Sequence, residues 1–153
     1  MDGNRTIAET LYERDFAAWA AEQGRALRAG DHEAVDWENV IEEIETLGRS
    51  ERSALRSAIL LILEHRLKLD HGLRDEPRRG WKRTVTVQRI HARKRLEDNP
   101  SLRPDVPSLI LAEYEAARLI ALASFEKYEE ANIAHYRAVL PLECPYSETD
   151  VLG

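Results

Sequence analysis

Residues 55–69 constrain the fold more than any other part of the chain, because apolar side chains there surround the whole circumference of a helix. Ala58 to Leu63 is an unbroken apolar run of six residues, and Leu67 and Leu69 follow it. A helix that is apolar on all sides must be covered by several neighbours. The run is far shorter than the roughly 20 residues that a membrane-spanning helix needs. The sequence therefore predicts the central helix of a bundle over about residues 50–70.

Helical spacing of apolar residues predicts four further main helices. They cover about residues 8–29, 36–48, 78–98 and 107–130. Gly30 is a typical stop for the first, the Asp36 carboxylate can cap the second, and Pro107 suits the start of the last. Gly48 lies between the second helix and the central one. A glycine costs a helix interior only about 1 kcal/mol relative to alanine, so a bend and a continuous helix both remain open there.

The other segments complete an all-α, single-domain bundle over residues 1–153. We expect a flexible N-terminus over 1–7, a proline-rich loop over 99–107, and an extended tail over 140–153 with a short helical turn that starts at Ser147. No stretch alternates like a strand. The apolar stripes predict a buried core that includes Phe16, Trp19, Ile41, Ile44, Leu55, Ile59, Ile62 and Leu119.

Three landmarks occur in order along the chain, and together they resemble a known family. They are the stretch 12–16 with Trp19, the block 36–52, and the stretch 143–146. With these landmarks the chain resembles, over about residues 12–152, a bacterial family catalogued as domain of unknown function 29. The resemblance implies a compact bundle of α-helices and no established activity.

Composition indicates the class of protein but not its activity. The 153 residues are 43% hydrophobic and 33% charged, which is typical of a soluble globular protein rich in charge. Cys144 is the only cysteine, so neither an internal disulfide nor a thiolate metal cage can form. Because residues 1–6 do not resemble a signal peptide, we expect the protein in the cytoplasm.

Acidic residues of the 36–48 helix invite a metal-binding interpretation, since di-metal bundles gather carboxylates from neighbouring helices. These residues are Glu38, Glu42, Glu43 and Glu45. Such sites also use a glutamate three residues before a histidine, and none of the five histidines has one. We therefore expect no metal and no cofactor, and we interpret the carboxylates as a solvated face.

A candidate polar centre comprises Trp37, Glu42, Glu43, His65 and Trp81. In one interpretation it is an enzyme pocket between helices two, three and four. Glu42 or Glu43 would be the base, His65 the acid or ligand, and Arg83 the anion contact. In the other, the tryptophans anchor the core or line a ligand pocket, and His65 is a core-edge residue with one hydrogen bond. No nucleophile elbow, phosphate loop or dinucleotide motif supports the first interpretation.

A basic segment, residues 78–95, departs from the overall charge. Eight cations and no acid lie between Pro77 and Leu96, and because the whole chain carries −6, the remainder carries −14. The candidate anion- or partner-binding surface is Arg78, Arg79, Lys82, Arg83, Arg89 and Arg93. These cations could pair with the acidic helix around Glu42, bind another protein, or lie along nucleic-acid phosphates.

The sequence favours a cytoplasmic protein-binding or regulatory module without chemistry of its own. The alternatives are the carboxylate–histidine enzyme and a weak nucleic-acid binder through residues 78–95. Another protein is the expected partner, a membrane is not, and the oligomeric state is open.

Overall fold

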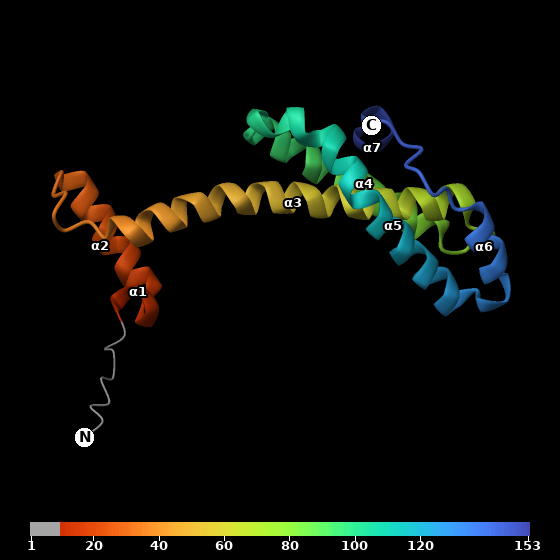
Figure 1. Cartoon of the computed structure of the whole chain (residues 1–153), viewed down its shortest axis with the longest axis horizontal. Coiled ribbons are helices and arrows are strands. Elements are labelled where there is room, and N and C mark those ends of the chain that lie inside the picture. Colours follow the sequence, from red (N-terminus) through yellow and green to blue (C-terminus); the bar gives the residue numbers. More distant parts are fainter. Residues whose placement is uncertain (1–9) are drawn as a thin grey trace, which may run out of the picture. The chain divides into compact units, whose positions relative to one another are not determined.

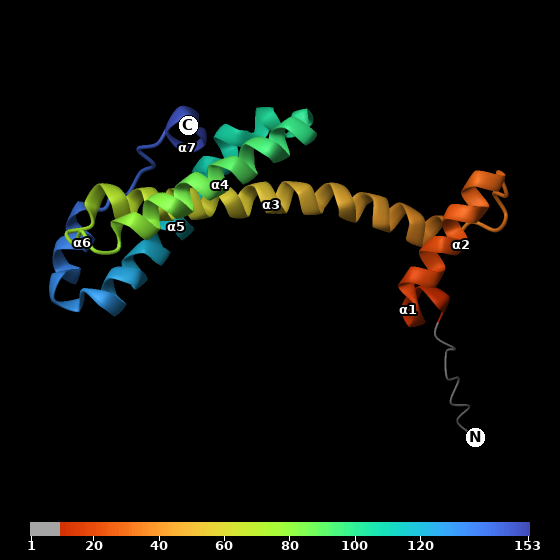
Figure 2. The ribbon, with the colours of Figure 1, turned by 180° about the vertical axis from the view of Figure 1, so that it is seen from behind.

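The computed structural model describes residues 10–153, and most of them are helical (Figures 1 and 2). The elements are α1 (Leu11–Arg14), α2 (Phe16–Ala29), α3 (Trp37–His71), α4 (Arg78–Asp98), the 3₁₀ helix η1 (Pro100–Asp105), α5 (Val106–Tyr128), the 3₁₀ helix η2 (Glu130–Asn132), α6 (Ile133–Val139) and α7 (Glu148–Leu152). These residues contain no strand, so the all-α prediction is confirmed. The segment expected to be flexible, 1–7, lies outside the described residues.

Two compact units divide the chain, residues 1–49 and residues 50–153. We refer to them as the first and second units and describe each by itself. Helix α3 contributes residues to both and continues through Gly48, so the two predicted helices 36–48 and 50–70 are one. The interpretation of residues 1–153 as a single domain stays a prediction.

The start of the first unit differs from the single helix predicted over 8–29. Asp15 ends α1 and begins α2, because its carboxylate accepts a hydrogen bond from the backbone N–H of Ala18 at 3.0 Å. An aspartate at this position satisfies an amide that the helix itself leaves unpaired. Gly30 ends α2 with a φ of 68°, a left-handed conformation that suits glycine, and this confirms the predicted stop.

A small core holds the first unit together around the start of α3. Trp19, Val35 and Val40 are buried there. Asp36 accepts hydrogen bonds from the Trp19 indole at 3.2 Å and from the Asn39 backbone N–H at 3.4 Å, which confirms the predicted cap. The Asn39 side-chain amide also donates to Asp36, and this bond holds the pKa of the carboxyl below its usual value.

Helices α3, α4 and α5 form the main core of the second unit. The α3 residues Leu55, Ile59, Ile62, Leu63 and Leu67 are all 0% exposed, as the all-round apolar pattern requires. Helix α4 returns alongside α3 in the opposite direction, since one end of the pair carries the contact from Arg95 to Glu51 and the other end brings Trp81 against Gly72. Helix α5 then runs back along α3, from the contact of Asp105 with Arg52 past that of Glu113 with Arg56.

Gly72 sets how closely α4 approaches the end of α3. A Cβ atom at this position would lie 2.5 Å from the Lys68 carbonyl oxygen and 2.8 Å from the Trp81 ring. Both distances are too short for a non-bonded contact. The absence of a side chain at residue 72 therefore allows Trp81 to pack where it does.

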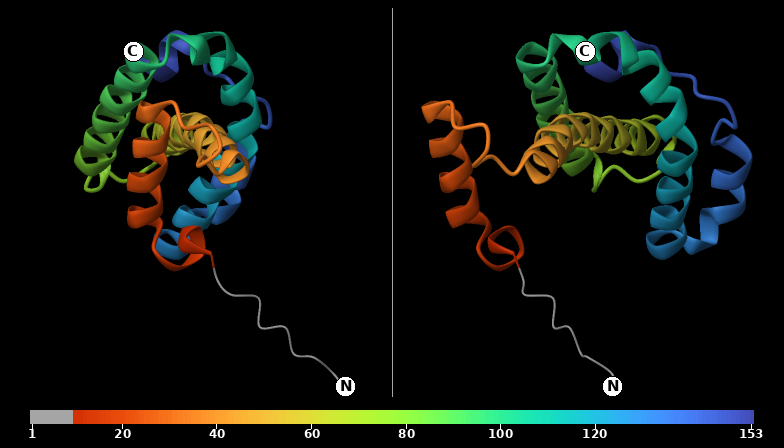
Figure 3. Two further views of the ribbon diagram at one scale, coloured as in Figure 1. Left: turned by 90° about the vertical axis from the view of Figure 1, so that its left-hand side faces the viewer. Right: turned by 60° about the vertical axis from the view of Figure 1, so that its left-hand side comes forward.

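The C-terminal elements close the second unit. Helix α6 lies beside the end of α5, as both panels of Figure 3 show, and it was not predicted. Helix α7 packs against α4 and α5; its Ser147 cap confirms the predicted turn. The predicted loop 99–107 is wrong, because residues 100–105 form η1 and α5 begins at Val106. Prolines suit the first turn of such helices, where their missing N–H is not needed.

Half of the predicted core is correct. Trp19, Leu55, Ile59 and Ile62 are buried, whereas Phe16, Ile41, Ile44 and Leu119 are 52–63% exposed. On α3 the small core of the first unit contacts Val40, and the Tyr12 hydroxyl contacts Glu43, whereas Ile41 and Ile44 lie beside these contacts and stay exposed. On α5 the buried residues on either side of Leu119 are Ala117 and Ala121, and a step of two residues rotates Leu119 by roughly 200° away from them.

Burial separates two isoleucines of the same helix, which makes a matched test. Truncating Ile59 to alanine should lower the free energy of unfolding by about 2–5 kcal/mol, since it leaves a cavity in a packed core. Ile44→Ala, at an exposed position, should change it by no more than about 0.5 kcal/mol. Urea denaturation of both variants measures the difference. Equal losses in the two variants would contradict the assignment of the core.

Candidate functional site

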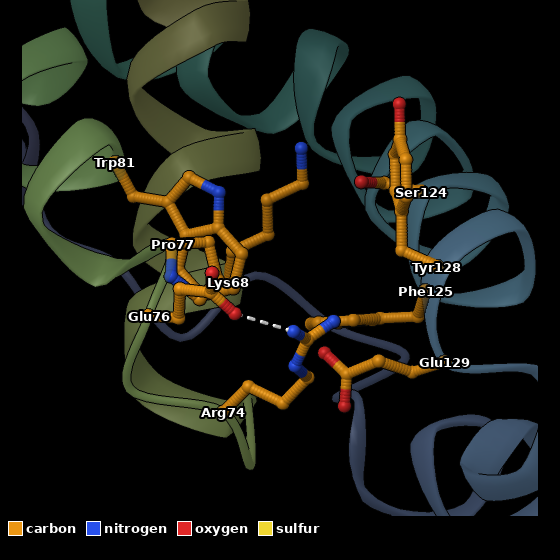
Figure 4. Close-up of a pocket in the computed structure, with 9 residues that line it drawn as sticks. All are labelled: Lys68, Arg74, Glu76, Pro77, Trp81, Ser124, Phe125, Tyr128 and Glu129. Carbon is orange, nitrogen blue, oxygen red and sulfur yellow. Dashed lines mark hydrogen bonds and ion pairs between the residues drawn. The ribbon is translucent and has the colours of Figure 1, made fainter.

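A cavity of about 490 Å³ lies at the end of the second unit where α3, α4 and α5 meet (Figure 4). Its wall comprises Lys68, Arg74, Glu76, Pro77, Trp81, Ser124, Phe125, Tyr128 and Glu129. The first comes from α3, the next three from the α3–α4 connection, and the others from α4, α5 and the residue after α5. A cavity of this volume falls within the roughly 300–1,000 Å³ that small-molecule sites occupy. We call it the aromatic cavity.

Three aromatic side chains give the cavity its apolar surface. Trp81 stands edge-on to Phe125, with ring centroids 6.4 Å apart, and Tyr128 follows on α5. Behind them Phe125 stacks on Tyr136 of α6, with centroids 3.8 Å apart. Tyr136 is fully buried, so the aromatic wall is held from behind and its rings keep their positions.

Three ionised residues of the cavity wall, Lys68, Arg74 and Glu76, have partners of opposite charge. Lys68 and Glu64, one turn apart on α3, form a buried ion pair. Figure 4 shows Arg74 reaching in from the connection towards Glu76, and their side chains lie 2.6 Å apart. A lysine and a glutamate in so apolar a place are tolerated because each neutralises the other.

Glu129 takes part in a separate hydrogen-bonded group. The Tyr136 hydroxyl donates to the Glu129 carboxylate and accepts from the backbone N–H of Leu73 at 3.2 Å. Burial and then the bond to Glu129 raise the pKa of Tyr136 above its usual value, so the hydroxyl keeps its proton. This group ties α6 to the α3–α4 connection. It gives the cavity a hydrogen-bonded polar rim.

The predicted polar centre is divided between the two units. Trp37, Glu42 and Glu43 belong to the first, and His65 and Trp81 to the second, so its assembly into one pocket stays a prediction. Trp81 lines the aromatic cavity, and His65 is not among the lining residues.

His65 fits the core-edge interpretation. Its Nδ1 lies 2.9 Å from the Leu61 carbonyl oxygen, one turn back on α3. Burial lowers the pKa of His65 below its usual value, and the nearby Glu64 opposes that shift. A neutral imidazole with one backbone hydrogen bond accounts for its position.

In the first unit the predicted residues have local partners. The Trp37 indole donates to the His32 carbonyl oxygen at 3.0 Å, although the side chain is exposed. The Tyr12 hydroxyl donates to Glu43 at 2.5 Å, and this bond, followed by burial, raises the pKa of Tyr12 to about 12. Glu42 is exposed on the same helix.

The predicted anion-binding residues do not share one surface. Arg78, Lys82 and Arg89 line a second hollow together with Arg66 of α3. The remaining three, Arg79, Arg83 and Arg93, are exposed and lie outside its wall. The acids expected to pair with this helix, Glu38 to Glu45, belong to the first unit, so that pairing stays a prediction.

Sequence reasoning missed Lys68, Arg74, Glu129 and Tyr136. The spacing of Glu64 and Lys68 by four residues was a usable signal, since such pairs face each other on a helix. Glu129 and Tyr136 carried no signal in the sequence. The helix that starts at residue 107 was expected to continue to residue 130, and α6 was not predicted.

Two further properties concern residues 10–153 as a whole. Within that range no three His, Cys, Asp or Glu side chains gather where they could hold a metal ion. None of its helices has the length and apolar character needed to cross a membrane.

The fold and the cavity define a small all-α protein with a preformed aromatic cavity at the end of its second unit. The chain belongs to the family described as domain of unknown function DUF29, whose model matches residues 11–153. This confirms the resemblance found in the sequence. Neither the curated proteins nor the solved structures contain a match to the chain.

The buried pair beside the cavity predicts a large and asymmetric response to mutation. Lys68→Met should lower the free energy of unfolding by about 3–5 kcal/mol, because it leaves the Glu64 carboxylate buried without a counter-charge. Adding Glu64→Leu should restore most of that loss. Arg49→Met is the matched control, since the Arg49–Glu45 pair has the same spacing and is exposed. It should cost no more than about 1 kcal/mol. Similar losses from Lys68→Met and Arg49→Met in urea denaturation would contradict the buried pair.

Proposed function

We propose that the protein is a cytoplasmic protein-binding module without catalytic activity, and that its first unit binds a basic amphipathic helix of a partner protein. The observation that carries this proposal is an apolar stripe on α3. Trp37, Ile41, Ile44 and Leu47 follow one another at steps of four, three and three residues and are 45–68% exposed. Residues at these steps share a helix face, and helix-in-groove recognition uses anchors with this spacing.

Acidic residues beside the stripe specify the charge of the partner. Glu38, Glu42 and Glu45 are exposed on the same helix, and Glu38 and Glu45 fall on one flank of the stripe. Within residues 10–49 ten acidic residues stand against four basic ones. A partner helix with apolar anchors and flanking lysines or arginines matches both properties, because complementary charge speeds association and fixes orientation.

Contacts with the rest of the first unit hold this part of α3 in place, so the stripe is an ordered surface. Val40 and Glu43, one turn before Ile44 and Leu47, are held by the small core and by the Tyr12 hydroxyl. The stripe thus lies beside residues that hold α3 within the first unit. A preformed helix loses little conformational freedom when a partner binds.

Two observations support a module over an enzyme. The ionised groups Lys68, Glu64 and Arg74 around the aromatic cavity have partners of opposite charge, and His65 has a backbone partner. Such groups are poorly placed to exchange protons with a substrate. Cys144 is a free thiol, which is consistent with the proposed cytoplasmic location.

The direct test is titration of the full chain with two model peptides, one a leucine–lysine amphipathic helix and the other its leucine–glutamate counterpart. The lysine peptide should bind and the glutamate peptide should not. Ile41→Ala with Ile44→Ala should weaken binding by about tenfold or more, the effect of losing two apolar anchors. Glu38→Lys with Glu45→Lys should weaken it and remove its dependence on salt. Leu119→Ala, at an exposed apolar position of α5, is the matched control and should have no effect.

Other occupants of the stripe give different outcomes. A dimer of the chain that dissociates on Ile41→Ala with Ile44→Ala would show that a second copy covers the stripe. A loss of stability of more than about 2 kcal/mol in the same variant would show that the chain itself covers it. Either result, or equal binding of both peptides, would overturn the proposal.

A further inference from the structure

The second hollow of the second unit suggests a role that is separate from the proposed binding of a partner protein. It has a volume of about 410 Å³ and lies between the later turns of α3 and the first half of α4. Its wall comprises Arg66, Leu69, Asp70, Arg78, Lys82, Val85, Thr86 and Arg89. Four of these residues are cations and one is an acid. We call it the cationic groove.

Asp70 offsets only one of the four cations of the groove. It accepts a hydrogen bond from the Tyr146 hydroxyl at 2.8 Å, and the Arg66 guanidinium approaches it only to 3.6 Å. A further acid, Asp150, is bound at the start of α7 by the Ser147 hydroxyl and backbone N–H. These bonds lower the pKa of Asp150, so it is ionised, yet it lies outside the groove wall. The groove therefore keeps an excess of positive charge.

Arg66 has hydrogen-bonding capacity that no described residue uses. Its Nε is buried and has no partner among residues 10–153. Its guanidinium lies over the Tyr146 ring, 5.5 Å from the centroid. A buried donor without an acceptor costs stability, and structures seldom contain one without a reason.

The other cations are also available for a ligand. Arg78 makes only long contacts, to the Gly72 carbonyl at 3.4 Å and to the exposed Asp75 at 4.0 Å. Lys82 has no carboxylate within ion-pair distance among residues 10–153. Arg89 is different, because its Nε and Nη2 donate to the carbonyls of Val151 and Asp150 and so hold α7 in place.

Crowding of these cations makes an anion favourable. Burial, and then the nearby Arg66 and Arg93, lower the pKa of Arg89 below its usual value. A bound dianion would replace repulsion between cations with attraction. Arginine forks match the oxygens of a phosphate group, and Lys82 would add a point charge. Leu69 and Val85 offer an apolar surface for an attached organic group.

We infer that the cationic groove binds the phosphate group of a small phosphorylated molecule, through Arg66, whose Nε has no partner among residues 10–153, together with Arg78 and Lys82. Arg89 is a positioning residue that anchors α7 beside the site. Binding of nucleic acid would be a different function, and a DNA duplex distinguishes it from phosphate binding.

The test uses the full chain and isothermal titration with inorganic phosphate and with phenyl phosphate at constant ionic strength. Both should bind, phenyl phosphate more tightly because its ring can contact Leu69 and Val85. Lys82→Gln removes one exposed cation of the groove without disturbing the core and should weaken binding of both by about tenfold. Arg66→Gln should weaken it at least as much, and Arg66→Lys should restore it only in part, because the fork is lost.

Arg83→Gln is the matched control. It removes one cation from the same helix, next to Lys82 in sequence but outside the groove, and should leave phosphate binding unchanged. Equal weakening by Arg83→Gln and Lys82→Gln would show general charge attraction and overturn the site. Absence of phosphate binding at millimolar concentrations would also overturn it. So would a short DNA duplex that binds more tightly than phenyl phosphate and loses affinity equally in both variants, since that identifies a nucleic-acid surface.

Discussion

The part of α3 between Leu55 and Leu67 is apolar and covered on most of its circumference, and the rest of the second unit depends on this constraint. Helices α4 and α5 cover it from two directions, and residues of α6 and α7 complete the same core. Burying apolar surface stabilises this arrangement at roughly 25 cal/mol per Å². The connection between α3 and α4 must then be tight, and Gly72 permits it by bringing Trp81 against the end of α3. The aromatic cavity lies where that packing ends.

Polar groups at the edge of this core are handled in two different ways. Around the aromatic cavity they are neutralised in pairs, as in Lys68 with Glu64, so its polar rim is fixed. Along the cationic groove they are left with an excess of one charge and with a buried donor on Arg66. The paired groups make a rigid wall for the aromatic cavity. The excess cations and the buried donor of the groove would be stabilised by a bound anion. The difference is why we assign the anion site to the groove.

Particular residues show how far the sequence could predict this structure. The helix periods, the Asp36 cap, the Gly30 stop and the central position of residues 55–69 follow from local chemistry, and all were predictable. Which face of an amphipathic helix is covered depends on the neighbour. Ile41 and Ile44 therefore looked like core residues and are exposed. The cavity and the groove join residues far apart in sequence, such as Arg66 with Lys82. No local pattern marks such pairs, so the anion surface was predicted on α4 alone and without Arg66.

Amide hydrogen exchange of the full chain, measured by NMR under native conditions, tests the central claim most directly. If residues 55–67 are the shared core of the second unit, their amides should exchange only through global unfolding and should be the slowest in residues 50–153. Amides of η1 and α7, at the edge of the unit, should exchange faster through local opening. Exchange of residues 55–67 as fast as that of α7 would contradict the account, because the helix would then open without unfolding the elements that cover it.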